Sequence, residues 1–303
     1  MKEKVIVIAG PTAVGKSGLG VKLAKLFNGE IISADSIQIY KNADIGSAKI
    51  TPSEQCGINH HLLSFLDVND SFSAGEFSRL AANVITDITS RGKVPIIVGG
   101  TGLYINSLLF PLTSSCPKNE ILRKQLLSIK EKEGNIALWN KLDRVDHETA
   151  KLLHVNQTDR IIRAIEIYET SGVKKSQLSK TQSSPYDYVY FVLNAERSEL
   201  YIKINERVDK MMEDGLVSEV QNLINNHHLN ETSPLLFGIG YREIFDYLNG
   251  KITLNESIEL IKTHSRNYAK RQLTWFKKAP GAIMVSISQT DEIITKTKEF
   301  LNG

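Results

Sequence analysis

One stretch near the amino terminus, IVIAGPTAVGKSGLG at residues 6–20, constrains the fold more than any other feature of the sequence. The run Val5–Ala9 is apolar and largely β-branched, which is typical of a strand buried on both faces of a parallel sheet. The following residues match the pattern G-x-x-x-x-G-K-[S/T] in full: Gly10, Pro11, Thr12, Ala13, Val14, Gly15, Lys16 and Ser17. A helical pattern, KSGLGVKLAKLF, follows directly. The sequence therefore predicts a strand, a phosphate-binding loop (P-loop) and a helix, in the order that the motif requires.

Each part of this loop suits a bound phosphate group. Glycines let backbone N–H groups wrap around phosphate oxygens, and the start of the next helix adds a favourable dipole. The ammonium group of Lys16 would pair with phosphate charge, and the hydroxyl of Ser17 would ligate Mg²⁺.

Further strands alternate with helical patterns along the chain. Apolar runs typical of strands are GEIISAD (29–35), KVPIIVGGTGLY (93–104), YVYFVLNA (188–195) and AIMVSIS (282–288). This alternation predicts an α/β fold, a P-loop NTPase-like and mostly parallel sheet flanked by helices. Residues 114–184 are turn-rich and then helical and charged, without a good strand, so we expect a helical insertion subdomain there. The expected organisation is a P-loop core at 1–113, the insertion at 114–184, and a return to the core at 185–303.

Composition bears on several classes of function. The net charge of +3 is too mild to indicate nucleic-acid binding by itself, so the position of the basic residues must decide. The two cysteines, Cys56 and Cys116, fit no metal-ligand spacing. No apolar run approaches the roughly 20 residues of a membrane span, and the run before Gly10 is too short for a signal peptide. We expect a cytoplasmic protein without membrane association, with the monomer as the default.

The residues alone leave open whether a phosphoryl group moves. A phosphoryl-transferring P-loop enzyme normally has an acid at the end of a neighbouring strand to hold its metal. The strand ending in IIVGGTGLY offers none, and the carboxylate at a strand tip is Asp35. Either Asp35 assists the metal, as in a kinase, or it does other work while the loop binds a diphosphate leaving group.

A family resemblance bears on this choice. The blocks GPTAVGKS, SADSIQIYKNADIGSAK, HHLLSFLDVNDSFSAGEF, VPIIVGGTGLY and GIGYREIFDYLNGKI…YAKRQLTWF follow one another as in bacterial tRNA dimethylallyltransferases, over nearly the whole chain. The resemblance implies transfer of a dimethylallyl group from dimethylallyl diphosphate to the N6 amine of the adenine 3′ of the tRNA anticodon (position 37). The loop would then bind the diphosphate, with Mg²⁺, while a carbon moves.

The resemblance also implies roles for particular residues. Asp35 would take the proton from the amine as the new bond forms, and Thr101 would hydrogen-bond the adenine or its phosphate. Arg207 would face the diphosphate. The adenine-contacting segment would be Asp35, Ser36, Ile37 and Gln38.

Contacts with tRNA are implied along two further stretches. The insertion resembles the family module that closes over the anticodon stem-loop, with Arg123, Arg160 and Arg163 as RNA contacts, although Gln157 and Asp159 depart from the family's usual pattern. Near the carboxyl terminus, Arg266 and Arg271 lie on a basic helix with Trp275 and Phe276 as candidates for base stacking, and Arg242 lies in the loop before it.

Three other interpretations remain at this point. A small-molecule kinase would use the same loop and sheet, and an isopentenyltransferase acting on free AMP or ADP would share the core. A non-catalytic RNA-binding module would have a vestigial loop. The adjacent pair His60 and His61 indicates packing rather than a metal site, because neighbouring side chains point in different directions on most backbones.

Overall fold

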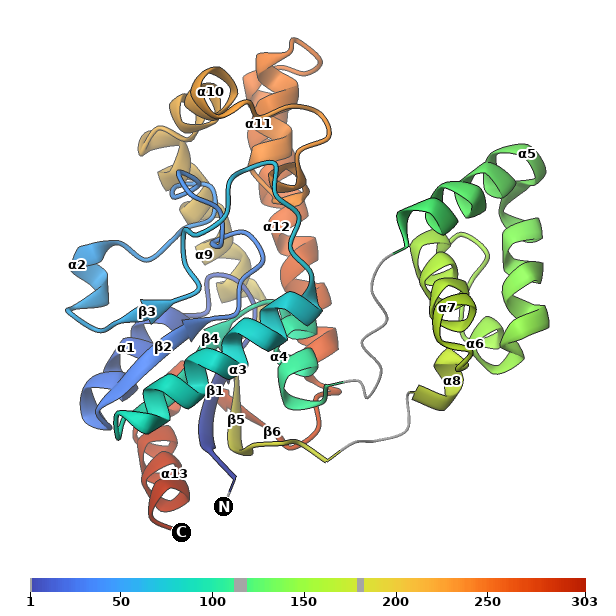
Figure 1. The fold of residues 1–303 in the computed structure, drawn as a ribbon. Helices are drawn as coiled ribbons and strands as arrows, with labels where there is room; N and C mark the ends of the chain where they lie inside the picture. The colour runs from blue at the N-terminus through green and yellow to red at the C-terminus, as the bar shows by residue number, and fades with distance from the viewer. Residues whose placement is uncertain (1, 112–118, 179–182) are drawn as a thin grey trace. The chain divides into compact units, whose positions relative to one another are not determined.

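The computed structural model of the chain describes residues 2–111, 119–178 and 183–303 (Figure 1). It divides into two compact units, one formed by residues 1–109 and 185–303 and the other by residues 110–184. The predicted domain boundary at residue 114, like Cys116, lies outside the described residues.

The first unit is built on one six-stranded sheet in the order β3-β2-β4-β1-β5-β6, and all of its pairs are parallel. The strands are β1 (Lys4–Ala9), β2 (Gly29–Ser33), β3 (His60–His61), β4 (Val94–Gly99), β5 (Asp187–Asn194) and β6 (Ala282–Ser286). The five runs predicted from the sequence all form strands. The two-residue edge strand β3 was missed, because so short a strand leaves no apolar run to detect.

The central position of β1 in the sheet explains why its sequence is apolar throughout. It pairs with β4 on one side and β5 on the other, with Ile6 opposite Ile96 and Val189. All of Val5–Ala9 is inaccessible to solvent. Burying each such side chain fully stabilises the fold by about 1.5–3 kcal/mol, so this strand anchors the loop that follows it.

Helices cover both faces of the sheet. In this unit they are α1 (Lys16–Leu26), α2 (Pro52–Gln55), α3 (Ala74–Ser90), α4 (Gly102–Leu109), α9 (Arg197–Glu213), α10 (Leu216–His227), α11 (Tyr241–Leu248), α12 (Leu254–Phe276) and α13 (Thr290–Asn302), with 3₁₀ turns η1 (Pro234–Phe237) and η2 (Ile287–Gln289). Ile6 and Ile8 share a core with α1 and α13. The side chains of the residues that alternate with Ile6 and Ile8 along β1 point to the opposite face of the sheet, where α3 runs across β2 and β4 (Figure 1).

A second apolar cluster supports the loops above the sheet. It joins α10, α11 and η1 to Ile39, Tyr40 and Ala43 in the segment after β2. Glu219 of α10 strengthens this junction, because its carboxylate accepts the backbone N–H groups of Asp44, Ile45 and Gly46 at 2.7–3.0 Å. The segment that begins at Asp35 is therefore held against helices from the far end of the chain.

The second unit is entirely helical in its described part. It contains α5 (Glu120–Val145), α6 (His147–Lys151), α7 (Thr158–Ser171) and α8 (Lys175–Leu178). Gly134, with φ 85° and ψ 173°, interrupts the helical geometry of α5. The two halves of α5 and α7 enclose a small core that includes Leu126, Leu138 and Ile165. No helix of the described chain combines the length and apolar character that crossing a bilayer requires.

A buried carboxylate secures the amino ends of the central strands. Glu30 on β2 is 1% exposed and accepts two hydrogen bonds from Arg91, at 2.6 and 2.8 Å, and one from Lys93 at 2.7 Å. The Nε2 atom of His61 lies 2.8 Å from the same carboxylate. Hydrogen bonds from Arg91 above all hold the pKa of Glu30 well below its usual range, against the opposing effect of burial.

We expect Glu30→Gln to lower the free energy of unfolding at pH 7 by about 3 kcal/mol, the low end for breaking a buried ion pair, because Arg91 and Lys93 are about a third exposed. Since the folded pKa lies below the unfolded one, wild-type stability from this group is present above about pH 4.5 and is lost as the pH falls further. Urea unfolding between pH 7 and pH 3 measures both effects. Asp67→Asn, which removes the exposed pair with Lys41, is the control and should cost less than about 1 kcal/mol. Equal losses for the two variants would contradict this prediction.

Candidate active site

The loops that follow β1, β2 and β4 gather at one edge of the sheet. These three strands are parallel neighbours, so their carboxyl ends lie side by side, where open α/β sheets place their ligands. The P-loop follows β1, Asp35 follows β2, and Thr101 follows β4.

The P-loop has the left-handed backbone positions that an anion nest needs. Gly10 has φ 146° and Gly15 has φ 96°. The ammonium group of Lys16 donates to the carbonyl of Pro11 at 2.6 Å, which folds the side chain back over the loop. Burial lowers the pKa of Lys16 to about 8; Asp35 opposes this shift and Arg207 adds to it. The loop is therefore a cationic site whose charge depends on pH near neutrality.

Arg207 of α9 lies at this loop although it is far away in sequence. Its Nη1 donates to the hydroxyl of Thr12 at 3.1 Å. Burial lowers the pKa of the guanidinium, and the negative charge of Asp35 opposes the shift. The structure thus brings Lys16, Arg207 and Asp35 within electrostatic reach of one another.

The two oxygens of Asp35 have different surroundings. Oδ1 accepts the backbone N–H groups of Ile37 at 2.9 Å and Gln38 at 3.3 Å, which fixes the carboxylate at the turn after β2. Within the described residues, no hydrogen bond reaches Oδ2. One oxygen positions the group and the other can receive a proton.

Thr101 joins the β4 loop to the segment after β2. Its Oγ1 accepts the N–H of Ser36 at 3.0 Å and donates to the hydroxyl of Ser36 at 3.3 Å. The amide of Gln38 is used within the protein, because it donates to the carbonyls of Ser47 and Ala48 and its oxygen accepts from Ser33. Gln38 therefore shapes the predicted adenine-contacting segment from within.

Two residues of α12 belong to the site and were missed by sequence reasoning. Gln272, 6% exposed, accepts the N–H of Thr12 and donates to the carbonyl of Gly100, both at 2.9 Å. Burial and the charge of Asp35 raise the pKa of Tyr268 to about 12, while hydrogen bonding to Thr101 and Gln272 opposes the rise. Nothing in the sequence YAKRQLTWF shows which face of this helix meets the loops.

The glycines of the β4 loop lie against α12, which fills the space beside them. A Cβ at Gly100 would lie 2.3 Å from Nε2 of Gln272, and one at Gly102 would lie 2.3 Å from the ring of Trp275. Close packing of α12 requires these glycines.

The basic stripe predicted on α12 is partly engaged in the fold. Arg266 donates to Asn205 at 2.7 Å and to Thr263 at 2.9 Å, and the guanidinium of Arg271 lies 5.6 Å from the ring centre of Tyr268. Phe276 is fully buried, so its predicted use for base stacking is wrong, whereas Trp275 is 38% exposed. Before this helix, Arg242 pairs with Asp246 at 3.2 Å.

In the helical unit, two of the three predicted RNA contacts share a buried carboxylate. Glu166 is inaccessible to solvent and accepts hydrogen bonds from Arg123 at 2.8 and 2.9 Å and from Arg163 at 2.5 Å. Burial opposes the shift, but hydrogen bonds from Arg123 and the backbone of Asn119 lower the pKa of Glu166 to about 2. Arg160 is exposed on the same helix.

The hydroxyl oxygen of the P-loop serine fits a Mg²⁺ ion carried by a substrate phosphate. Among the described residues, no group of three or more His, Cys, Asp or Glu side chains lies close enough together to hold a metal ion. The hydroxyl of Ser17 is exposed at the start of α1, beside the loop. Mg²⁺ commonly takes one or two protein oxygens and completes its shell with phosphate oxygens and water.

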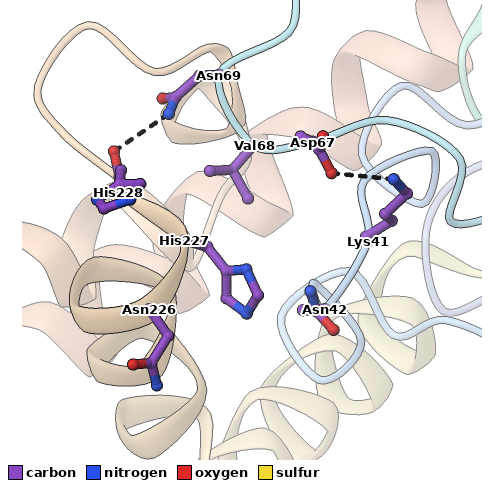
Figure 2. A pocket seen from close by; sticks show the side chains of 8 residues that line it. All are labelled: Lys41, Asn42, Asp67, Val68, Asn69, Asn226, His227 and His228. Atoms are coloured by element: carbon purple, nitrogen blue, oxygen red, sulfur yellow. Dashed lines mark hydrogen bonds and ion pairs between the residues drawn. The ribbon is translucent and has the colours of Figure 1, made fainter.

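A pocket of about 320 Å³ lies apart from these residues (Figure 2). It is lined by Lys41, Asn42, Asp67, Val68, Asn69, Asn226, His227 and His228. Lys41 and Asp67 form an ion pair at 3.0 Å across it, and Asn69 donates to the carbonyl of His228 at 3.2 Å. It contains none of the residues predicted from the sequence, so it is not part of the candidate active site.

The P-loop follows β1, and a fixed carboxylate follows β2, which is separated from β1 in the sheet by β4. This arrangement defines a P-loop protein that handles a phosphorylated substrate. More particularly, the chain belongs to the IPP transferase family, whose family model matches residues 38–279.

Individual relatives agree with this membership. The chain is 44% identical to a tRNA dimethylallyltransferase of Geobacillus thermodenitrificans, covering 99% of this chain and 96% of the relative. It is 45% identical to one of Carboxydothermus hydrogenoformans, covering 92% and 91%. Two crystal structures are similar: a tRNA isopentenylpyrophosphate transferase of Bacillus halodurans (TM-score 0.73, 40% identity, 99% and 97% covered) and a eukaryotic dimethylallyltransferase acting on tRNA (TM-score 0.86, 32% identity, 99% and 80% covered).

The pKa of Lys16 gives a pH prediction. Because its charge is lost above about pH 8, we expect the affinity for inorganic diphosphate to fall about tenfold between pH 7 and pH 9 beyond the diphosphate's own titration. Lys16→Arg keeps a positive charge throughout, so it should show only the titration of the ligand. Isothermal titration calorimetry of both proteins measures the difference. The same pH dependence in wild type and variant would show that Lys16 does not titrate in this range.

Proposed function

We propose that this prenyltransferase moves a dimethylallyl group from dimethylallyl diphosphate to the N6 amine of the adenine 3′ of the anticodon in tRNA, giving N6-isopentenyladenosine and diphosphate. The observation that carries the proposal is the arrangement of Asp35. Its Oδ1 is held by two backbone N–H groups, its Oδ2 accepts no hydrogen bond within the described residues, and two cations of the P-loop region lie within reach of its charge.

The part of the site that binds the prenyl donor must stabilise the charge of a leaving diphosphate. Breaking the allylic C–O bond places negative charge on the diphosphate, which Lys16, Arg207 and the loop N–H groups would bind; Lys16 bonds to Pro11 and Arg207 to Thr12 within the loop. Mg²⁺ bound through Ser17 and the diphosphate would supply further charge stabilisation. A partly buried, cationic nest favours the charged leaving group over the esterified donor, which is what accelerates bond breaking.

The part of the site that binds the acceptor adenine must activate a weak nucleophile. The exocyclic amine of adenine is part of an aromatic system, so its proton has to leave as the new C–N bond forms. Oδ2 of Asp35 would take this proton, and the hydroxyl of Thr101, which accepts the N–H of Ser36 beside Asp35, would orient the base.

The tRNA itself would be bound mainly by positively charged side chains. Arg160 is exposed, while Arg123 and Arg163 are held in fixed positions by Glu166. Such pre-positioned guanidinium groups suit the phosphates of an anticodon stem-loop. A tRNA substrate implies action in the cytoplasm, and we expect the monomer to be active.

The role of Asp35 is tested by Asp35→Asn. Asparagine retains an oxygen for the N–H groups of Ile37 and Gln38 but cannot act as a base, so we expect kcat to fall about 10²- to 10⁴-fold. Mass spectrometry of tRNA, incubated with dimethylallyl diphosphate and Mg²⁺, measures the added isopentenyl unit. Asp44→Asn, in the same segment but with an exposed side chain that pairs with Lys49, should stay within about threefold of wild type. An Asp35→Asn protein with wild-type kcat would remove Asp35 as the base.

Two further incubations separate the rival functions, one with labelled ATP and one with AMP or ADP in place of tRNA. A kinase would transfer the γ-phosphate of labelled ATP, which we expect not to occur. An enzyme for free nucleotides would prenylate AMP or ADP in the absence of tRNA at a rate comparable to that with tRNA. Either result would contradict the proposed substrate.

The RNA contact of Arg160 is tested separately. We expect Arg160→Ala to weaken binding of an anticodon stem-loop and to reduce the slope of log K against log salt by about one, without loss of thermal stability, because the side chain is exposed. Fluorescence anisotropy at several salt concentrations measures the slope. Lys151→Ala, another exposed cation of this unit, paired with Glu148, is the control. An unchanged slope in Arg160→Ala would place the RNA elsewhere.

A further inference from the structure

The amide group of Gln272 bonds to both halves of the candidate active site. Its Oε1 accepts the N–H of Thr12 in the P-loop, and its Nε2 donates to the carbonyl of Gly100, the residue before Thr101, each at 2.9 Å. One side chain from α12 thus connects the loop that would hold the diphosphate to the loop that would orient the adenine.

The surroundings of this amide leave it little freedom. Gln272 is 6% exposed, and both ends of its amide are used. A Cβ at Gly100 would lie 2.3 Å from Nε2, so the β4 loop can approach this closely only through a glycine. A buried amide that loses one partner leaves an unsatisfied polar group, which is costly, so the two loops are expected to move together.

The bond to Thr12 also defines how the P-loop is held. The backbone N–H of Thr12 is directed to Gln272, so within this loop it anchors the backbone instead of serving as a phosphate donor. The hydroxyl of Thr12 accepts from Arg207 at 3.1 Å. Two helices, α9 and α12, therefore fix the same residue, one through its side chain and one through its backbone.

We propose that Gln272 is a positioning residue that couples the diphosphate site to the adenine site. An anion that orders the P-loop also orders Gly100 and Thr101 through this amide, and occupation of the acceptor side orders the P-loop in return, because such coupling is reciprocal. The inference rests on the proposed function, since it takes the β4 loop as the acceptor side.

The test measures coupling in the full-length protein. The affinity for an anticodon stem-loop is determined by fluorescence anisotropy with and without inorganic diphosphate and Mg²⁺, and the ratio of the two dissociation constants is the coupling factor. For wild type we expect a factor of about 5–50. Gln272→Met keeps the length of the side chain but forms neither hydrogen bond, so its factor should fall to within about twofold of one. Its kcat for prenyl transfer should fall about 10- to 100-fold, because the reacting groups are no longer held in register.

A matched control separates coupling from general destabilisation. Ser257 is another fully buried polar residue of α12, and its hydroxyl donates only to Leu254 of the same helix. Ser257→Ala should lower stability slightly and leave the coupling factor at the wild-type value. If Gln272→Met does not fold, Gln272→Glu is used instead. It retains an acceptor for Thr12 but cannot donate to Gly100, and its coupling factor is likewise expected to fall to about one.

The outcomes distinguish the two proposals. Three results would overturn the role of Gln272 and leave the proposed function intact. A Gln272 variant could keep the wild-type coupling factor, or Ser257→Ala could lower that factor as much as the Gln272 variant does. The third result is a wild-type protein that prenylates tRNA but has a coupling factor of one. A wild-type protein that binds diphosphate but prenylates no tRNA would instead overturn the proposed function and with it the acceptor side of this inference.

Discussion

Hydrogen bonding between β1 and its two parallel neighbours is the constraint on which the rest of the structure depends. With β4 on one side and β5 on the other, β1 is excluded from water over Val5–Ala9, and the loop after it has one fixed position. Because β2 pairs with β4 in the same direction, the turn at Asp35 meets the same edge. The P-loop, the carboxylate and Thr101 converge because parallel strands end together, and no contact between their side chains is needed to gather them.

The two ends of β2 illustrate how burial serves different purposes in one strand. At the amino end, Glu30 is buried among Arg91, Lys93 and His61, and every one of its interactions is internal. At the carboxyl end, Asp35 is only half-buried, and backbone N–H groups hold one oxygen while the other accepts no hydrogen bond in the described chain. A fully paired carboxylate stabilises the fold, whereas a half-paired one is available for chemistry.

The helices that complete the site come from the end of the chain. Arg207 on α9 and Gln272 on α12 both bind Thr12, so the P-loop is fixed by residues 195 and 260 positions away. In the helical unit, Glu166 does similar work for Arg123 and Arg163. At the P-loop, Thr12 belongs to the motif, whereas Gln272, which holds its backbone in place, is remote in sequence and carries no motif.

The sequence by itself determined the strands, the P-loop and the candidate carboxylate, because apolar β-branched runs, a Gly-rich turn and a strand tip are local signals. It also indicated Arg207, through the resemblance. Only the tertiary structure decided which side of α12 faces the loops. Tyr268, Gln272 and Trp275 share a helix with Arg266, Lys270 and Phe276, and a helical pattern cannot say which neighbour packs against which face. For that reason Phe276 was mistaken for a surface residue, and Gln272 was overlooked. Packing between distant segments is the sum of many weak contacts, and it becomes visible only once the chain is folded.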